Sequence, residues 1–497
     1  MRNALLEGAR WWEAAFAAAG HSGGFKVEMM PDGADAMDVR YNVIQWVHRA
    51  TRGWSYGASV TDPRTGEIIK GHVTLGSLRV RQDYLIAEGL LAPYDEDGLT
   101  PSAMQEMALA RLRQLSAHEV GHTLGLAHNY VSSTQNRASV MDYPHPLVTV
   151  DSRGRLDLTG AYAVGVGEWD KVAIEYGYRE FADEAAGLSK VLDAAHKRGL
   201  YFVSDDDARP AGSAHPQTHL WDNGVNAVAE LERMLDVRRR ALERFGDRSI
   251  RMGAPMATIE EALVPTYLLH RYQTEAASKV LGGLDYRYAL RGDGQKVTAM
   301  VAGAEQRRSL EALLRTIQPE TLALPERILK LIPPRPEGYD AHREMFARRT
   351  GVTFDPLAAA ESAAGITVTL LLHPERAARL VEYHARDAQL PGLEEVIQKV
   401  LVETWMKPRV SGLGAEVQRV VDRVVLNRLL GLAALQAGAY AKTGELERWI
   451  EKRIAAEADA RQKAHLAQTL DLLKRWRTDP KSVVLPAVLE APPGQPI

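Results

Sequence analysis

The spacing of apolar residues changes along the first 100 positions of the chain. Over residues 1–20 apolar side chains recur every three or four positions and glutamates interrupt them, which predicts an amphipathic helix and not an export signal. Between residues 24 and 76 the pattern alternates instead, and residues 59–62 and 68–75 flank a turn that contains proline and glycine. This part of the chain therefore predicts short strands that include a hairpin.

Helical spacing dominates most of the remaining sequence. Residues 42–49 fit a helix better than a strand, and residues 101–127 carry an apolar stripe that predicts one long helix. Further helices are predicted over residues 226–245, 258–281, 375–388, 393–405, 415–440 and 460–476. We therefore expect an α+β unit over residues 1–180, followed by a mainly α-helical region over residues 181–497. A proline-rich stretch makes residues 333–355 the candidate point of subdivision within that region.

The composition narrows the chemistry that the chain can use. Its 497 residues include 61 Lys and Arg against 64 Asp and Glu, so we expect no nucleic acid as a partner. No apolar run approaches the ~18 residues of a membrane span, so no span is predicted. Cysteine is absent, which excludes disulfides, thiolate metal sites and a cysteine nucleophile. Any metal must therefore be held by His, Asp or Glu. Nothing in the sequence indicates an oligomeric state.

One stretch of the predicted long helix carries a metal-binding pattern. His118, Glu119 and His122 begin the sequence HEVGHTLGLAH, which matches H-E-x-x-H-x-x-G-x-x-H at every specified position. Two histidines four positions apart project from the same face of a helix and can share one metal ion. The helix repeat turns Glu119 by about 100° from His118, which lets its carboxylate reach a metal-bound water instead of the metal.

The end of this pattern supplies a third ligand. Gly125 lies about one turn after His122, where a residue with positive φ can end the helix and redirect the chain. That change of direction would bring His128 to the same metal ion. Three neutral histidines leave one coordination position open, which is typical of a catalytic zinc site and not of a structural one. The sequence therefore predicts one catalytic Zn²⁺ on His118, His122 and His128.

A second motif follows, and its methionine lies 13 residues after His128. The sequence SVMDYP, which contains Met141 and Tyr143, resembles the Met-turn of the metzincin metalloproteases. The resemblance implies that Met141 lies in a tight turn beneath the three histidines. It also implies that Tyr143 contacts the metal or the oxyanion of the reaction, as in astacin-like and serralysin-like metzincins. Taken from the residues alone, Tyr143 would be a turn tyrosine with a structural hydrogen bond.

Two longer segments narrow the resemblance to one bacterial family. WVHRATRGWSYGASVTDPRTGEIIKGHVTLGS and GEWDKVAIEYGYRE are similar to the bacterial zinc-dependent metalloproteases called Met-zincins. The resemblance implies a metzincin-like catalytic domain over residues 1–180, with a twisted mixed sheet and an active-site helix. It also implies a periplasmic or secreted location. Members usually begin with an export signal and an extra N-terminal domain, so we expect this chain to be a truncated form or a stand-alone catalytic portion.

The resemblance further implies hydrolysis of peptide bonds in an extended substrate. Such folds usually bind substrate as an added strand at an exposed sheet edge, and the expected edge here is Gly71, His72, Val73 and Thr74. The Asp205–Asp207 run is a weak candidate for calcium, because an isolated acidic run is more typical of a solvated turn.

Two alternatives from other classes remain at this point. The chain could be a catalytically silent zinc-binding scaffold or binding module, although the presence of Glu119 argues against silence. It could also be a zinc hydrolase of non-peptide amides.

Overall fold

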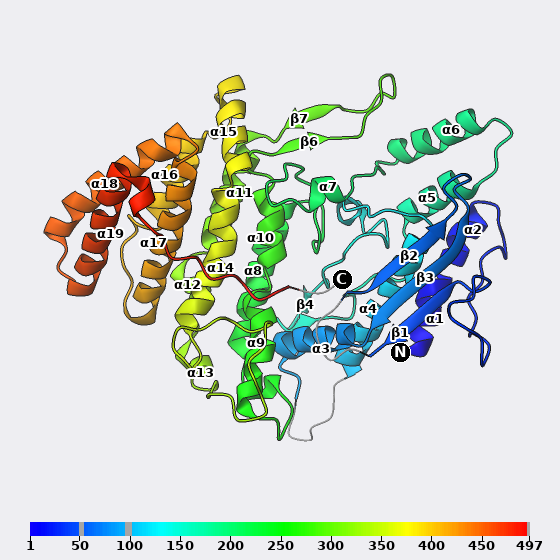
Figure 1. Ribbon diagram of the computed structural model, residues 1–497, viewed down its shortest axis with the longest axis horizontal. Coiled ribbons are helices and arrows are strands. Elements are labelled where there is room, and N and C mark those ends of the chain that lie inside the picture. Colours follow the sequence, from blue (N-terminus) through cyan, green and yellow to red (C-terminus); the bar gives the residue numbers. More distant parts are fainter. Residues whose placement is uncertain (49–53, 95–101, 495–497) are drawn as a thin grey trace.

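The chain folds into a mixed α+β structure that is mostly helical (Figure 1). The computed structural model describes residues 1–48, 54–94 and 102–494. The N-terminal part carries a three-stranded sheet, and a bundle of helices lies at the opposite end of the molecule. The structure thus agrees with the predicted α+β class and with the predominance of helix after residue 180.

The N-terminal part combines helices with one small mixed sheet. Its elements are α1 (Arg2–Arg10), α2 (Trp12–Ala18), β1 (Val43–Val47), β2 (Tyr56–Thr61), β3 (Ile68–Gly76), α3 (Leu78–Leu91), α4 (Ser102–Thr123), the 3-10 turn η1 (Ser132–Gln135), the β4 (Thr149–Val150) and β5 (Leu156–Asp157) hairpin, α5 (Glu168–Tyr178) and α6 (Glu184–Lys197). The predicted N-terminal helix and the predicted long helix are both present, as α1 with α2 and as α4.

The sheet corrects the prediction about the substrate edge. Its strand order is β1-β3-β2, with β1 parallel and β2 antiparallel to β3. Gly71, His72, Val73 and Thr74 belong to β3, and all four pair with both neighbouring strands or with one of them. The prediction that these residues form an exposed edge is wrong, because the central strand already uses its backbone groups on both sides. The antiparallel edge strand is β2.

Strand β1 corrects a second prediction. Residues 42–49 fit helical spacing in the sequence, but Val43–Val47 form a strand in parallel register with β3, in which Val43 faces His72. The segment is rich in β-branched and aromatic side chains that are partly buried on both faces. Short apolar runs of this kind do not distinguish strand from helix by periodicity, and here the pairing with β3 decides.

Helix α4 lies against the sheet and carries the metal-binding pattern. It packs on β2, β3 and α1 (Figure 1). The approach to β2 is very close: a Cβ atom added at Gly57 would lie 2.0 Å from the carbonyl oxygen of Glu119. The core on this side of α4 contains Trp12, Leu75 and Met141, all at most 1% exposed. These contacts fix the helix rigidly beneath the sheet.

The remainder of the chain is built from helices with two further short strands. Its elements are α7 (Asp205–Ala208), α8 (Ala227–Arg244), η2 (Asp247–Ser249), η3 (Met256–Thr258), α9 (Ile259–Tyr267), α10 (Arg271–Ser278), β6 (Leu284–Tyr286), β7 (Thr298–Met300), α11 (Gly303–Arg315), α12 (Pro319–Leu322), α13 (Glu326–Leu329), α14 (Pro356–Leu371), α15 (Pro374–Arg386), α16 (Leu393–Glu403), α17 (Gly412–Ala433), α18 (Ala437–Ala456), α19 (Ala460–Thr478) and η4 (Pro480–Ser482). Two of the predicted helices are divided, since residues 258–281 form α9 and α10 and residues 415–440 cover most of α17 and the start of α18.

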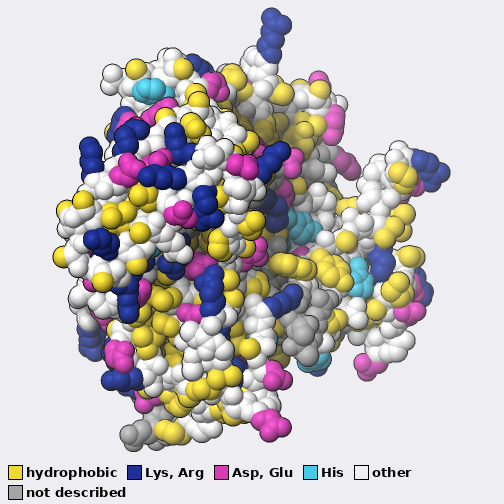
Figure 2. Space-filling model, turned by 60° about the vertical axis from the view of Figure 1, so that its left-hand side comes forward, with side chains coloured by type: hydrophobic (Ala, Val, Ile, Leu, Met, Phe, Trp, Pro, Cys, Tyr) yellow, Lys and Arg dark blue, Asp and Glu magenta, His cyan; other side chains and the backbone are white. Residues whose placement is uncertain are grey.

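These helices share one hydrophobic core. It includes residues from Val228 on α8 to Trp476 on α19. It also includes Phe346 and Phe354, which lie in the segment 333–355 where a subdivision was predicted. One stretch, Pro356–Arg386, is by length and composition apolar enough to cross a membrane, but 72% of its most apolar segment is buried inside the protein. This stretch is therefore a core helix segment of the bundle. On the face shown in Figure 2, acidic and basic side chains are interspersed over the helices.

A second core cluster joins the two parts of the molecule. It contains Ile86 and Met104 from the N-terminal part together with Met234 and Leu269 from α8 and the segment after α9. Helix α3 packs directly on α8 and α9. The predicted division at residue 180 therefore crosses a continuous apolar core.

Candidate metal centre

Three imidazoles come together at the C-terminal end of α4. His118 and His122 lie one turn apart on the helix, and His128 reaches them from the segment that follows. Their ligand-capable nitrogen atoms all lie within 4.8 Å of one another. Among the described residues, no other cluster of three or more His, Asp or Glu side chains has this arrangement.

Gly125 provides the change of direction that brings His128 back to the helix. Its φ of +85° lies in the left-handed region. The Gly125 N–H donates to the His122 carbonyl (3.0 Å) and the Leu126 N–H donates to the Gly121 carbonyl (3.1 Å). This pair of bonds is a Schellman motif, which ends a helix and satisfies two of its last carbonyl groups.

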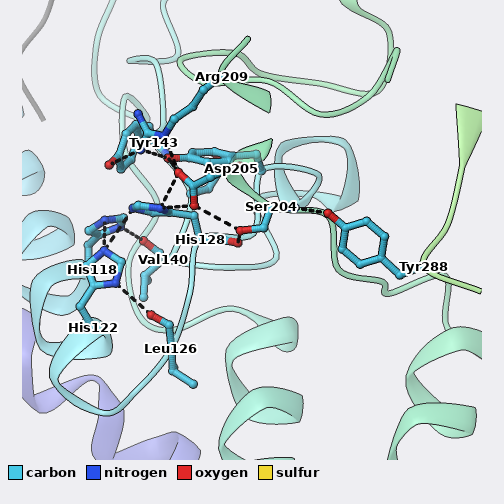
Figure 3. A network of polar contacts seen from close by, with 12 residues as sticks. His118, His122, Leu126, His128, Val140, Tyr143, Ser204, Asp205, Arg209 and Tyr288 are labelled. Atoms are coloured by element: carbon cyan, nitrogen blue, oxygen red, sulfur yellow. Dashed lines mark hydrogen bonds and ion pairs between the residues drawn. The ribbon is translucent and has the colours of Figure 1, made fainter. Parts of the chain in front are cut away.

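Each of the three imidazoles is held through its Nδ1 atom (Figure 3). The acceptors are the carbonyl oxygens of Val140 (2.7 Å from His118) and Leu126 (2.9 Å from His122) and the carboxylate of Asp205 (2.9 Å from His128). Carbonyl and carboxylate oxygens only accept, so Nδ1 carries the proton in every ring. The Nε2 lone pair of each ring is therefore free to bind a metal.

The three Nε2 atoms point at one another. The His122 Nε2 lies 3.2 Å from the His118 Nε2 and 3.1 Å from the His128 Nε2. Three unprotonated nitrogens at this separation repel, and a cation between them would convert the repulsion into coordination. A set of three neutral imidazoles suits Zn²⁺ with one position left open. The residues present therefore fit a single zinc ion.

Burial keeps these rings neutral. It lowers the pKa of His118 well below its ordinary value, lowers that of His122, and lowers that of His128 to about 4. The hydrogen bond from His128 to Asp205 acts in the opposite direction but does not cancel the effect of burial. Only a neutral imidazole offers a lone pair to a metal, so the site is ready for a ligand role at neutral pH.

Glu119 lies beside the histidines on α4, and it is almost completely buried. Its Oε1 atom has no hydrogen-bond partner among the described residues, while the Gly57 N–H donates to the carboxylate. Burial raises the pKa of Glu119 to about 7, and the guanidinium of Arg111 and the Gly57 N–H oppose this rise. A carboxylate with a pKa near neutrality can both accept and return a proton.

Met141 is buried against α4. It is 1% exposed, and its Sδ atom packs so closely on α4 that a Cβ atom added at Gly121 would lie 2.2 Å from it. The turn itself is fixed by Asp170 on α5, which accepts from the Ser139 hydroxyl (2.6 Å) and from the Val140 N–H (2.9 Å). The turn thus holds the carbonyl that orients His118 and places a soft side chain under the helix.

Two tyrosines line the site. The Tyr143 ring lies 5.2 Å from the His118 ring and 4.8 Å from the His128 ring. Tyr130 stacks on His128 at 5.0 Å. Burial raises the pKa of both Tyr130 and Tyr143, and for Tyr143 the hydrogen bond from Tyr130 and the Arg209 guanidinium oppose that rise. Both phenols are therefore protonated at neutral pH, and both can donate a hydrogen bond.

Residues far along the chain complete the site, and sequence reasoning missed their role. Asp205 on α7 accepts from His128, and Arg209, which caps α7, donates to Asp205 and to both tyrosines. Asp207 accepts from the hydroxyls of Tyr286 and Tyr288. Asp205 and Asp207 therefore hold the third histidine and two tyrosines, and among the described residues the acidic run is not part of a cluster that could hold a metal ion. Its only signal in the sequence is the cluster of acids itself.

The chain matches a known protein-family model. The family model described as Met-zincin matches residues 100–412 of the 497-residue chain. The chain belongs to the Met-zincin family. Neither the search of curated proteins nor the search of solved structures produced a match.

The matched range of this Met-zincin begins just before α4 and ends at the start of α17. It therefore contains the three histidines, the Met141 turn and the Asp205–Arg209 segment. The sheet, which supplies Gly57, lies before it. Family membership indicates a zinc metallopeptidase, and the buried histidine cluster is consistent with that activity.

Proposed function

We propose that this Met-zincin is a zinc-dependent endopeptidase. The observation that carries the proposal is the convergence of three Nε2 atoms whose rings are each fixed through Nδ1. His118, His122 and His128 would hold one Zn²⁺, which when bound lowers the pKa of a water molecule and polarises the scissile carbonyl. Family membership and the presence of Glu119 favour catalysis over a silent zinc-binding scaffold.

Glu119 is assigned the role of general base. Its unpartnered Oε1 and its raised pKa suit a group that accepts a proton from the attacking water and later donates it to the leaving amine. Tyr143 is assigned the role of hydrogen-bond donor to the oxyanion, a contact that is commonly worth about 3 kcal/mol. Met141 and Gly125 are assigned supporting roles, as the floor of the site and as the end of the helix.

The extended substrate is assigned to β2. This strand pairs with β3 on one side, and on its other side no strand pairs with it in the part of the chain that the structure describes. Its Gly57 lies directly against Glu119, so a peptide added along β2 would pass beside the general base. The catalytic unit is assigned to residues 1–180, completed by Asp205 and Arg209 from beyond it.

The test is a combined measurement of metal content and cleavage. Purified protein should contain one zinc per chain and cleave peptides in a quenched-fluorescence library, and a chelator should remove both properties. Glu119→Gln should lower kcat by at least about 100-fold, because it removes the proton acceptor, while zinc content stays at one per chain. Cleavage is measured by fluorescence and zinc by elemental analysis.

The control is Glu106→Gln, since Glu106 is an exposed carboxylate on the same helix. It should leave both zinc content and kcat unchanged. Zinc binding without cleavage of any peptide by the unaltered protein would favour the silent scaffold, and cleavage of amides other than peptides would favour the other alternative. Full activity of Glu119→Gln would overturn the assignment of the base.

A further inference from the structure

Arg209 contacts three of the groups that shape the metal centre. It follows the last residue of α7, and its side chain is 41% exposed. One nitrogen, Nη2, donates to the hydroxyl oxygens of Tyr130 (2.7 Å) and Tyr143 (3.1 Å), and Nε donates to the Asp205 carboxylate. The guanidinium also lies over both tyrosine rings, 5.5 and 5.4 Å from their centroids. No other cation among the described residues makes hydrogen bonds to these groups in this way.

The direction of these bonds makes the two hydroxyls different. Each tyrosine oxygen accepts from Arg209, so each hydroxyl proton must point elsewhere. The Tyr130 hydroxyl lies 3.5 Å from the Asp205 Oδ1 atom and is also hydrogen-bonded to the Tyr143 oxygen. The Tyr143 oxygen accepts from Arg209 and from Tyr130, so its own proton points away from both of them. Arg209 therefore leaves Tyr143 with a free proton to donate at the metal centre.

The same guanidinium orients the third histidine through Asp205. The Asp205 carboxylate accepts from His128 Nδ1 at 2.9 and 3.1 Å (Figure 3). Since Arg209 and Asp205 lie four residues apart around the short helix α7, their ion pair fixes the carboxylate in one orientation. A carboxylate behind a metal-binding histidine sets its tautomer and ring orientation and raises its strength as a ligand.

We propose that Arg209 is a positioning residue that couples the third histidine of the metal centre to the hydroxyl of Tyr143. Through Asp205 it supports metal binding, and through its Nη2 atom it holds Tyr143 as a donor. The second role rests on the proposed peptidase function, whereas the first concerns metal affinity alone. The rigid planar fork of the guanidinium is required, because a lysine ammonium cannot reproduce its fixed set of donor directions.

The first test measures zinc affinity without any substrate. Arg209→Met should raise the zinc Kd by at least about threefold, and Asp205→Ala should raise it by about 10–100-fold, as loss of the carboxylate behind a ligand histidine usually does. In the Asp205→Ala background, Arg209→Met should have almost no further effect, because the path from Arg209 to His128 is already broken. Zinc Kd is measured by competition with a chromophoric chelator.

The second test measures turnover with zinc saturating, so that loss of affinity does not enter. Arg209→Met should lower kcat by about tenfold and leave KM within about twofold, because the contact that it supports forms in the transition state. In a Tyr143→Phe background the same substitution should change kcat by less than about twofold. Arg209→Lys should restore neither kcat nor zinc Kd completely.

The matched control is Arg386→Met. Arg386 is also an exposed arginine in an ion pair four residues from its carboxylate, Glu382, on α15 and remote from the metal centre. It should change neither zinc Kd nor kcat, and circular dichroism should show that all variants are folded.

Two results would overturn the proposal. One is additivity of Arg209→Met with both Asp205→Ala and Tyr143→Phe, which would mean that Arg209 acts through neither residue. The other is full rescue by Arg209→Lys, which would reduce its role to charge. If the unaltered protein binds zinc but cleaves no peptide, the proposed function fails while the zinc measurements still decide the coupling through Asp205.

Discussion

Tyr130 and Tyr143 carry the same hydroxyl group in the same network, and only their hydrogen-bond partners distinguish them. Tyr130 stacks on His128 and its hydroxyl is directed toward Asp205 and Tyr143, while Tyr143 lies against both His118 and His128 and accepts from Tyr130 and Arg209. At the scale of single residues, the roles proposed for the two tyrosines therefore differ because their hydroxyl protons point in different directions. The two side chains have the same chemistry, so only their surroundings distinguish their proposed roles.

Tyr143→Phe should lower kcat by at least about tenfold, because it removes a donor to the oxyanion. KM and zinc Kd should change by less than about twofold, since the ring and its contacts with the histidines remain. Tyr162→Phe is the matched control: Tyr162 is a buried tyrosine whose hydroxyl has no partner among the described residues. An unchanged kcat for Tyr143→Phe would leave Tyr143 with a purely structural role.

The separation of the site residues along the chain explains which of them could be predicted from the sequence. His118, His122 and Glu119 are related by the repeat of one helix, so their spacing carries the geometry. Asp205 binds His128 across 77 positions of sequence, and no local pattern links them. Its acidic neighbours instead indicate a solvated turn, which is what such runs usually form.

At the scale of elements, the site depends on how closely α4 approaches its neighbours. The helix contacts β2 through Gly57 and the Met141 turn through Gly121, and at each point a Cβ atom would lie about 2 Å from another atom. Helix and strand periodicity predicted α4 and the β2–β3 hairpin correctly. Periodicity gave the wrong state for residues 42–49, and the family resemblance led to the wrong position for β3. Strand order arises from long-range pairing that local spacing does not encode.

Gly121→Ala should destabilise the protein by about 1–3 kcal/mol, because the added methyl group meets the Met141 Sδ atom and the Trp12 ring in a closely packed core. Gly431→Ala is the control, and its expected effect on folding stability is the opposite. Gly431 is an exposed glycine in α17 with open space around its Cβ position, so alanine should stabilise the helix by roughly 0.5–1 kcal/mol. Urea denaturation of both variants measures the changes, and an unchanged midpoint for Gly121→Ala would contradict the packing argument.

At the scale of the whole molecule, the predicted division at residue 180 does not coincide with a boundary of the core. Apolar residues of α3 and α4 share one cluster with Met234, Val237 and Leu269 from the helical region. The ion pair of Arg81 with Glu261 also crosses the division (2.7 Å). Since Asp205 and Arg209 come from the same region, the helices after residue 180 support both the stability and the chemistry of the N-terminal part.

Residues 1–180 expressed alone should therefore be less stable than the full chain and should bind zinc at least about tenfold more weakly. The fragment exposes the face of α3 that packs on α8 and α9, and it lacks the carboxylate of Asp205. Thermal unfolding followed by circular dichroism, together with chelator competition, measures both effects. Adding residues 181–497 in trans should restore zinc affinity if the two parts reassemble. Cooperative unfolding of the fragment at the Tm of the full chain, with undiminished zinc affinity, would instead establish residues 1–180 as an autonomous domain.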